Sequence, residues 1–297
     1  MNEGAKDTFG TAAARRVPRI AVLVPCYNEA VTIAKVVDDF HAALPDAEVY
    51  VYDNNSTDGT GAIAREHGAT VRTERRQGKG NVVRQMLRDV DADYYVMVDG
   101  DDTYPAEAAP ALLAPLVADE ADMSVGDRLS NGTYGEENDR AFNAVFAKTM
   151  PVLSPGFEIE TELSIHAVDK RWRIAEVPID YRDRPAGSVS KLSTFSDGTK
   201  VLLTILSLFK DYRPLVLFSW LALLFCVLGL FAGVPVVVEF MQTGLVPKLP
   251  SALLAVALVF VGVLCFASGL ILDTVVKGTR KEYELEVTRA YERYARR

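Results

Sequence analysis

The sequence predicts an α/β domain with a mostly parallel sheet, followed by two membrane-spanning helices. Two observations support this fold class. Through the first two thirds of the 297 residues, short apolar runs rich in β-branched residues alternate with segments of helical periodicity, which is typical of parallel strands joined by crossover helices. The last third contains two uncharged apolar runs of about 24 residues each, and runs of that length can cross a bilayer.

The elements of the α/β part are assigned from these runs in chain order. Strands are expected at Ile20–Pro25, Glu48–Tyr52, Ala69–Thr73, Tyr94–Val98 and Met123–Val125, with one more within Trp172–Tyr181. Helices are expected at Val31–Leu44, Gly59–His67, Gly80–Asp89 and Pro105–Val117.

A polar cluster follows each of three expected strands. The clusters are Cys26-Tyr27-Asn28-Glu29, Asp53-Asn54-Asn55-Ser56 and Asp99-Gly100-Asp101-Asp102. In parallel sheets, ligands bind outside the carboxyl ends of the strands. The three clusters therefore predict a binding cleft at one edge of the sheet.

Asp99 and Asp101 are the expected centre of the chemistry. Residues two apart on a strand point the same way, and Gly100 allows a bend as the strand ends. Crowded carboxylates repel each other unless a cation offsets their charge. Mg²⁺ and Mn²⁺ both suit carboxylate and phosphate oxygens, so the pair predicts a divalent metal site.

The segment Arg75–Gly80, which contains Gly78-Lys79-Gly80, precedes an expected helix. Glycines there let backbone N–H groups approach an anion, and a solvated surface turn remains the alternative. The segment is not a Walker A loop, because the spacing and the Lys-Ser/Thr pair are missing.

Composition narrows the classes of function. The net charge of −8 argues against a nucleic-acid partner. The three cysteines and three histidines show no metal-ligand or disulfide spacing. For His41, His67 and His166 we expect surface or packing roles.

The membrane part is expected to be a two-helix hairpin, with spans at Leu215–Val238 and Leu249–Leu272. Basic residues flank its outer ends, which places both flanks in the cytoplasm and the protein in the cell membrane as a multi-pass protein. The expected organisation is a flexible tail (1–18), a catalytic domain (19–192), an amphipathic interface helix (193–214), the hairpin (215–272) and a charged cytoplasmic tail (273–297). The segment 193–214 fits a membrane-surface helix, and a helix packed on the catalytic domain is the alternative.

Together the motifs resemble family 2 glycosyltransferases of the GT-A fold, and especially the dolichyl- or polyprenyl-phosphate sugar synthases. The matching segments, over about residues 19 to 280, are Val24–Glu29, Asp53–Thr60, Gly78–Gly80, Asp99–Asp101, Gly126–Arg128 and Arg184–Lys191, followed by the two spans. The resemblance implies transfer of one hexose, with inversion, from GDP-mannose or UDP-glucose to a polyprenyl or dolichyl phosphate at the cytoplasmic face.

The resemblance also implies roles for individual residues. The nucleotide-sugar site would consist of Pro25, Tyr27, Glu29, Asp53, Gly78, Lys79, Asp99, Gly100 and Asp101, in which Asp53 faces the base. Asp99 and Asp101 would hold Mg²⁺ or Mn²⁺ and the diphosphate. Arg128, Arg184 and Lys191 would gather the lipid and donor phosphates, because guanidinium and ammonium groups suit phosphate. Self-association is compatible with so small a membrane footprint.

Two departures from the family pattern keep alternatives open. The stretch from Arg128 to Phe157 is short, which predicts a reduced lipid-facing part of the site, and the Arg184–Lys191 segment has one extra residue. A polysaccharide synthase and a catalytically impaired scaffold are the alternatives, although the Gln-x-x-Arg-Trp motif of the former is incomplete before Arg171-Trp172. Glu160 and Glu162 could act as a general base, and we favour their orienting Arg184 or Lys191.

Overall fold

The computed structural model describes residues 16–127, 140–156, 158–179 and 213–295. The chain divides into two compact units, Met1–Ser188 and Val189–Arg296. Most of the expected interface helix (193–214) and most of the N-terminal tail lie outside the described residues, and so do the site residues Arg128, Arg184 and Lys191. Pro214, the last residue of that expected helix, begins α8.

The described part of the first unit contains a seven-stranded sheet with strand order β3-β2-β1-β4-β6-β5-β7. The strands are β1 (Ile20–Cys26), β2 (Glu48–Asp53), β3 (Thr70–Thr73), β4 (Tyr94–Met97), β5 (Met123–Asp127), β6 (Arg140–Asn143) and β7 (Ile174–Pro178). Only β6 pairs antiparallel to its neighbours, β4 and β5, among these strands. The mostly parallel α/β sheet predicted from the sequence is confirmed.

Strand β1 lies at the centre of the parallel part of the sheet, between β2 and β4. Its apolar run is buried from Ala21 to Cys26, because helices cover both faces of the sheet and leave no polar side. The register sets Cys26 opposite Asp53. The polar residues that follow β1 and β2 therefore begin at the same level of the sheet edge.

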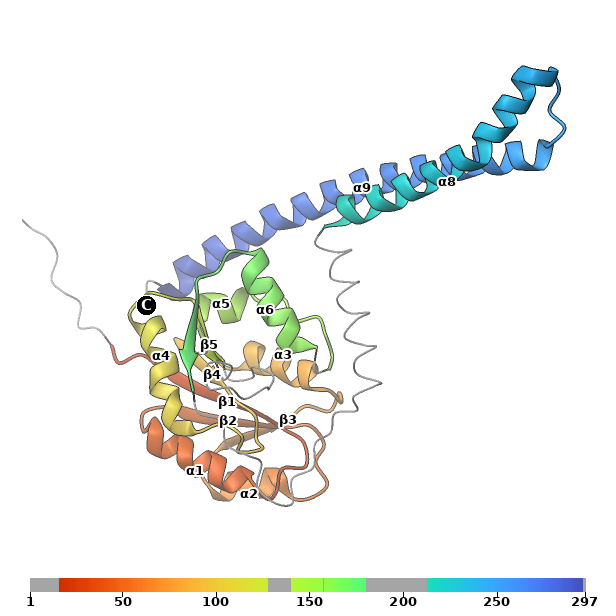
Figure 1. Ribbon diagram of the computed structural model, residues 1–297. Coiled ribbons are helices and arrows are strands. Elements are labelled where there is room, and N and C mark those ends of the chain that lie inside the picture. The colour runs from red at the N-terminus through yellow and green to blue at the C-terminus, as the bar shows by residue number, and fades with distance from the viewer. Residues whose placement is uncertain (1–15, 128–139, 157, 180–212, 296–297) are drawn as a thin grey trace, which may run out of the picture. The chain divides into compact units, whose positions relative to one another are not determined.

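Helices cover the sheet on both faces (Figure 1). One face carries α1 (Ile33–Ala43), α2 (Thr60–Glu66), the 3₁₀ turn η1 (Ala106–Ala108) and α4 (Ala109–Val117), whose apolar residues share one core with β1, β2 and β4. The other face carries α3 (Lys79–Asp89) and α5 (Ala144–Thr149), with α6 (Ile159–Asp169) beside them. The strand β6 and the helices α5 and α6 were not predicted from the sequence.

The second unit is a hairpin of two long helices, α8 (Pro214–Thr243) and α9 (Leu249–Ala290), which ends in the π-helical turn η3 (Tyr291–Ala295). Each contains an 18-residue window of mean hydropathy 2.7 and is long enough to cross a membrane. Helix α9 continues without a break past Leu272. The described part of the charged segment after that residue is therefore helical and continuous with the second apolar run.

Small residues at seven-residue intervals form the seam between α8 and α9. The buried residues of this series are Ala222, Gly229 and the larger Val236 in α8, and Ala255, Gly262 and Gly269 in α9. A Cβ atom at Gly262 would lie 2.8 Å from Cys226 Sγ and 3.0 Å from the carbonyl oxygen of Ala222. Side chains this small let the two backbones approach closely, an arrangement that is common in pairs of membrane helices.

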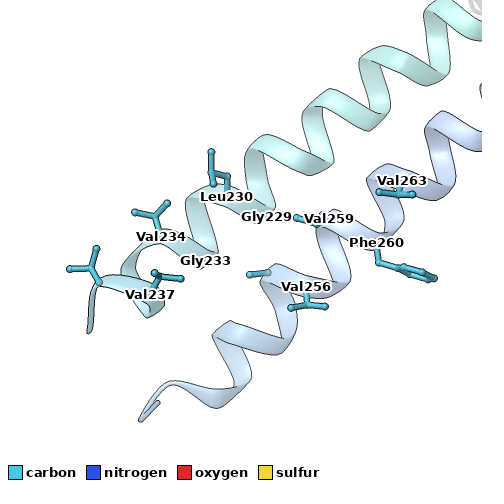
Figure 2. A pocket seen from close by; sticks show the side chains of 11 residues that line it. Gly229, Leu230, Gly233, Val234, Val237, Val256, Val259, Phe260 and Val263 are labelled. Atoms are coloured by element: carbon cyan, nitrogen blue, oxygen red, sulfur yellow. The ribbon is translucent and has the colours of Figure 1, made fainter. Parts of the chain in front are cut away.

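An apolar groove of about 690 Å³ lies between the two helices where they approach the connecting loop (Figure 2). Gly229, Gly233 and Ala255 leave its floor open, and Val237 and Phe260 are among its walls. The lining residues of α8 lie on both sides of Pro235, an interior proline, which removes one helical hydrogen bond and locally disturbs the helix.

Candidate active site

The three predicted polar clusters meet at one edge of the sheet, because β1, β2 and β4 are adjacent and parallel. The backbone N–H of Asn54 donates to the carbonyl oxygen of Cys26 over 2.9 Å, and that of Val98 donates to the carbonyl oxygen of Leu23 over 3.1 Å. The first bond joins the cluster after β1 to the cluster after β2, and the second holds the end of β4 against β1.

The turn after β4 is fixed by a contact with α1. The hydroxyl of Thr32 donates to the carbonyl oxygen of Gly100 over 2.6 Å. A Cβ atom at Gly100 would lie 2.6 Å from Cys26 Sγ, so glycine is required here by close packing. Its backbone is not left-handed, whereas Asp102 has φ +57°. The bend was expected at Gly100, and the structure places the left-handed residue two positions later.

The carboxylates of this turn have different surroundings. Asp101 is buried, and its Oδ1 accepts a hydrogen bond of 2.7 Å from the hydroxyl of Thr103. Asp102 is also buried, and its Oδ1 lies 2.8 Å from Lys35 Nζ. Lys35 thus offsets the charge of Asp102, whereas the partner found for Asp101 is a neutral hydroxyl.

Lys79 lies between two carboxylates. Its Nζ is 2.7 Å from Asp99 Oδ1 and forms a second ion pair with Glu160. The side chains of Lys79 and Glu160 are only 9% and 10% exposed. Burial alone would lower the pKa of Lys79, but the charges of Asp99 and Glu160 raise it above its usual value. The ammonium is therefore charged throughout the neutral range.

Glu160 opens the first turn of α6, and its pKa is raised mainly by burial, an effect that the charge of Lys79 partly offsets. We expected Glu160 to orient Arg184 or Lys191, or to act as a base. In the structure Glu160 contacts Lys79. Arg184 and Lys191 lie outside the described residues, so both expected roles stay predictions. The nucleotide contact predicted for Lys79 stays a prediction.

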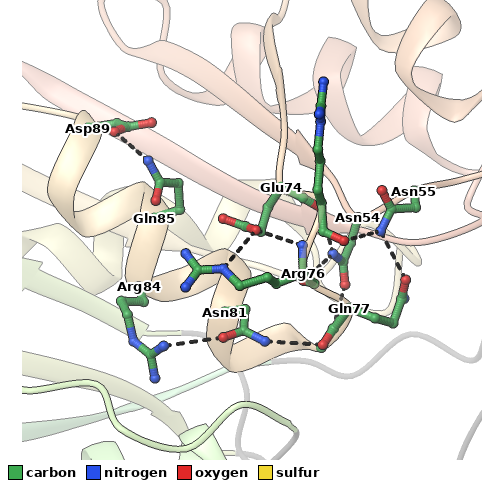
Figure 3. A network of polar contacts seen from close by, with 11 residues as sticks. Asn54, Asn55, Glu74, Arg76, Gln77, Asn81, Arg84, Gln85 and Asp89 are labelled. Atoms are coloured by element: carbon green, nitrogen blue, oxygen red, sulfur yellow. Dashed lines mark hydrogen bonds and ion pairs between the residues drawn. The ribbon is translucent and has the colours of Figure 1, made fainter.

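The loop between β3 and α3 is held by the buried side chain of Asn54 (Figure 3). Its Nδ2 donates to the carbonyl oxygens of Glu74 and Arg76, each over 2.8 Å, and its Oδ1 accepts from the backbone N–H of Gly78 over 2.7 Å. One amide thus fixes the path of the chain up to Lys79.

The segment 152–156 packs against the N-terminus of α3. A Cβ atom would lie 2.2 Å from the carbonyl oxygen of Pro155 if placed at Gly78, and 1.9 Å from that of Ser154 if placed at Gly80. The N–H of Gly80 donates to the carbonyl oxygen of Gly156 over 3.1 Å. The absence of side chains at these glycines therefore lets the backbone of the segment 152–156 approach closely. From the sequence we expected the glycines to let backbone N–H groups approach an anion, or to form a solvated turn.

Two charged side chains hold the segment 152–156 in place. Glu162, in α6, accepts from the backbone N–H groups of Leu153 and Ser154 over 3.0 and 2.8 Å. Arg84, in α3, donates to the carbonyl oxygens of Val152 and Leu153 over 2.7 Å each. In the structure Glu162 therefore holds the backbone of the segment 152–156 in position.

The residues predicted to face the nucleotide surround the same sheet edge. Pro25 is buried, Tyr27 is 39% exposed and Glu29 is half-buried. Asp53 Oδ1 accepts from the backbone N–H of Ser56 over 2.8 Å. The N–H of Glu29 donates to the hydroxyl of Thr60 over 2.9 Å. These residues stand at the ends of the neighbouring strands β1 and β2, and their contacts with a nucleotide stay predictions.

Arg140 is a charged residue of this site that the sequence analysis did not identify. It begins β6, opposite Met97 of β4, and is 2% exposed. Its guanidinium donates to Ser164 Oγ over 3.1 Å, and its charge lowers the pKa of Glu160. A single arginine outside any motif gave no signal in the sequence.

The donor set fits a hard divalent cation. Asp99 and Asp101 offer carboxylate oxygens on the two sides of Gly100. No cluster of three histidine, cysteine, aspartate or glutamate side chains with metal-binding geometry occurs among the described residues. Two carboxylates, completed by phosphate oxygens and water, are a common arrangement for Mg²⁺ bound with a phosphorylated substrate, and Mn²⁺ takes the same hard ligands.

Comparison with known proteins decides the family. The model of glycosyl transferase family 2 matches residues 21–167, from β1 into α6. The glycosyltransferase AglJ of Haloferax volcanii is 34% identical over 228 residues, which are 67% of this chain and 75% of AglJ. The chain belongs to glycosyl transferase family 2. This glycosyltransferase carries all the described site residues, from Pro25 to Glu160, inside the matched region.

Two further similarities extend the comparison. A dolichyl-phosphate hexose transferase of Haloferax volcanii is 30% identical over 220 residues, 65% of this chain and 95% of that protein. The crystal structure of glucosyl-3-phosphoglycerate synthase from Mycobacterium tuberculosis, with Mn²⁺, UDP and its product, has a TM-score of 0.50 and 24% identity over 57% of this glycosyltransferase and 73% of the synthase. The latter similarity shows that the catalytic unit has a GT-A-like fold.

Proposed function

We propose that this glycosyltransferase moves one hexose from GDP-mannose or UDP-glucose to a polyprenyl or dolichyl phosphate at the cytoplasmic face of the cell membrane. The observation that carries the proposal is the carboxylate pair Asp99 and Asp101 at the end of β4, in a protein that also contains two helices able to cross a membrane. The name of the dolichyl-phosphate hexose transferase relative supports the class of acceptor.

The residues divide into three groups in this proposal. Tyr27, Glu29 and Asp53 line the nucleotide pocket, and Asp99 and Asp101 hold Mg²⁺ or Mn²⁺ against the diphosphate. Arg128, Arg184 and Lys191, which lie outside the described residues, bind the lipid and donor phosphates. The crystallised Mycobacterium tuberculosis synthase contains Mn²⁺, in line with metal use here.

The chemistry is a single displacement. An oxygen of the acceptor phosphate attacks C1 of the sugar, the bond from C1 to the diphosphate breaks, and the electron pair leaves with the nucleoside diphosphate. The configuration at C1 is inverted. When bound, the metal ion offsets the charge that grows on the leaving diphosphate. The acceptor phosphate is already anionic at neutral pH, so the reaction depends on positioning and charge rather than on a strong base.

The test uses membranes that contain the full chain. Labelled GDP-mannose and UDP-glucose are supplied separately with a polyprenyl phosphate and Mn²⁺, and the products are separated by charge and size. We expect label in an anionic lipid, and its loss in the variant Asp101→Asn. Asp46→Asn, a change in the loop before β2 and outside the site, is the matched control.

The other outcomes assign the alternatives. Label in a long polymer would replace this proposal with a polysaccharide synthase. A folded protein that transfers no sugar from either donor would favour the scaffold alternative and contradict the proposal.

A further inference from the structure

Four buried or half-buried charged side chains of alternating sign are arranged one after another in space, beside the candidate metal site. Asp99 pairs with Lys79, Lys79 pairs with Glu160, and the charge of Arg140 acts on Glu160. They come from the end of β4, from α3, from α6 and from β6, respectively. Such a set requires four separate segments to fold together, so it is a built arrangement and not a surface coincidence.

The position of Lys79 affects any cation that approaches Asp99. Its ammonium lies 2.7 Å from Asp99 Oδ1 and is paired on its other side with Glu160, and the side chain is only 9% exposed. A divalent cation held by Asp99 and Asp101 would therefore lie within a few ångströms of a fixed positive charge. In so enclosed a place, water screens that repulsion only weakly.

We propose that Lys79 keeps the Asp99–Asp101 pair at low affinity for free divalent cations, so that the ion binds only together with the donor diphosphate. Lys79 is in this sense a positioning residue, and Glu160 holds it beside Asp99. The inference rests on the proposed use of a nucleotide sugar with a metal ion. A nucleoside diphosphate supplies the additional negative charge that offsets Lys79. The dependence of metal binding on the nucleotide therefore follows from electrostatics.

The segment 152–156 explains how this position of Lys79 is maintained. It packs on the start of α3 through the close approaches at Gly78 and Gly80, and it is joined to α6 by the hydrogen bonds of Glu162. Lys79 and Glu160 are thus fixed by the same set of backbone contacts. Their pairing does not depend on two flexible surface side chains finding each other.

The experiment measures Mn²⁺ binding to the purified full chain in detergent, by the electron paramagnetic resonance signal of free Mn²⁺, with and without GDP or UDP. The wild-type protein is expected to bind Mn²⁺ weakly alone and tightly with one of the nucleotides. Lys79→Met is expected to raise the affinity without nucleotide by about tenfold or more, since one nearby positive charge is lost. Lys79→Arg keeps the charge and is expected to resemble the wild type.

The variant Glu160→Gln is expected to change the Mn²⁺ affinity in the opposite direction. With Glu160 neutral, the charge of Lys79 is less compensated, and Mn²⁺ affinity without nucleotide is expected to fall below that of the wild type. A purely structural role would weaken binding in both Lys79→Met and Glu160→Gln. The double variant Lys79→Met/Glu160→Gln removes both charges of the ion pair between α3 and α6, and it should bind free Mn²⁺ more tightly than the wild type.

The two proposals fail in different ways. If the wild-type protein binds Mn²⁺ with a nucleotide, but the double variant binds free Mn²⁺ no more tightly than the wild type, the role of Lys79 is wrong and the proposed function stands. If neither nucleotide supports Mn²⁺ binding to the wild-type protein, the metal–diphosphate site of the proposed function is itself overturned.

Discussion

The hydroxyl of Thr32 lies 2.6 Å from the carbonyl oxygen of Gly100 and donates a hydrogen bond to it. Thr32 precedes the first turn of α1, and Gly100 separates the two candidate metal ligands. The position of the turn after β4 therefore depends on a helix that contributes no side chain to the metal. Because the hydroxyl is buried, water is not available to replace it.

Replacing Thr32 by valine, which has nearly the same shape, tests this contact. The carbonyl oxygen of Gly100 would lose a buried donor, and we expect the free energy of unfolding to fall by about 1 to 3 kcal/mol. Sugar transfer should fall by about tenfold or more, because the carboxylates shift. Thermal melting in detergent and a transfer assay measure the two effects. Thr32→Ser keeps the hydroxyl and should lose much less of either.

Gly100→Ala places a methyl group against Cys26 Sγ, at a separation of 2.6 Å if nothing moves. We expect a strong loss of nucleotide-dependent Mn²⁺ binding, because the turn must shift to relieve the overlap. Adding Cys26→Ala removes the sulfur and should restore much of the binding. Gly278→Ala, at a position with no atom within 4 Å, is the control. Absence of rescue in the double variant would show that the overlap with Cys26 is not the cause.

Asn54→Ala removes three hydrogen bonds to the backbone of the loop that precedes α3 (Figure 3). We expect a loss of roughly 2 to 4 kcal/mol in the free energy of unfolding, because buried backbone groups lose their partners. Gln77→Ala, an exposed residue of the same loop, should change it by less than about 0.5 kcal/mol. Equal effects in the two variants would contradict the assigned role of Asn54.

His166, in α6, predicts a pH dependence of stability. Burial, together with the charge of Lys170, lowers its pKa to about 4. An unfolded histidine titrates near 6.5, so between about pH 6.5 and 4 the unfolded chain binds more protons. Stability is therefore complete above about pH 6.5 and is lost as the pH falls toward 4. His166→Gln should lessen this loss, as measured by melting temperatures from pH 7.5 to 4.5; an unchanged pH profile would refute the assignment.

Gly262→Val tests the seam of the hairpin. A side chain at Gly262 meets Cys226 Sγ and the carbonyl oxygen of Ala222 at 3.0 Å or less, so α8 and α9 must separate. We expect the melting temperature of the full chain in detergent to fall by several degrees. Gly278→Val, in the same helix but away from the seam, is the matched control. A fall of the same size in both variants would point to helix propensity rather than to packing.

The sequence was most informative where an apolar strand is followed directly by a polar cluster. The runs that became β1 and β4 are buried over almost their whole length, so they are continuous and apolar. In β2 the buried residues are Val49, Val51 and Tyr52. Their polar ends then follow from the rule for parallel sheets. The predicted helices α1, α2 and α3 also lie within two residues of their expected limits.

The remainder depends on contacts between distant segments. Strand β6 has four residues and begins with Arg140, so neither its length nor its pattern indicates a strand. The pairing of Lys79 with Glu160 joins residues 81 positions apart, which no local motif encodes. The packing role of Gly78 and Gly80 was likewise hidden, because a glycine needed for close approach looks the same in a sequence as one needed for a loop.

The uninterrupted course of α9 has a consequence for the C-terminal end of the chain. Beyond Leu272 the helix extends about 27 Å further, at the usual rise per residue. A lipid headgroup layer is only about 5 to 8 Å thick. In a membrane that ends at Leu272, Lys277 is therefore within reach of the headgroups, whereas Arg289 stands in water, too far out to anchor the protein to the lipid surface.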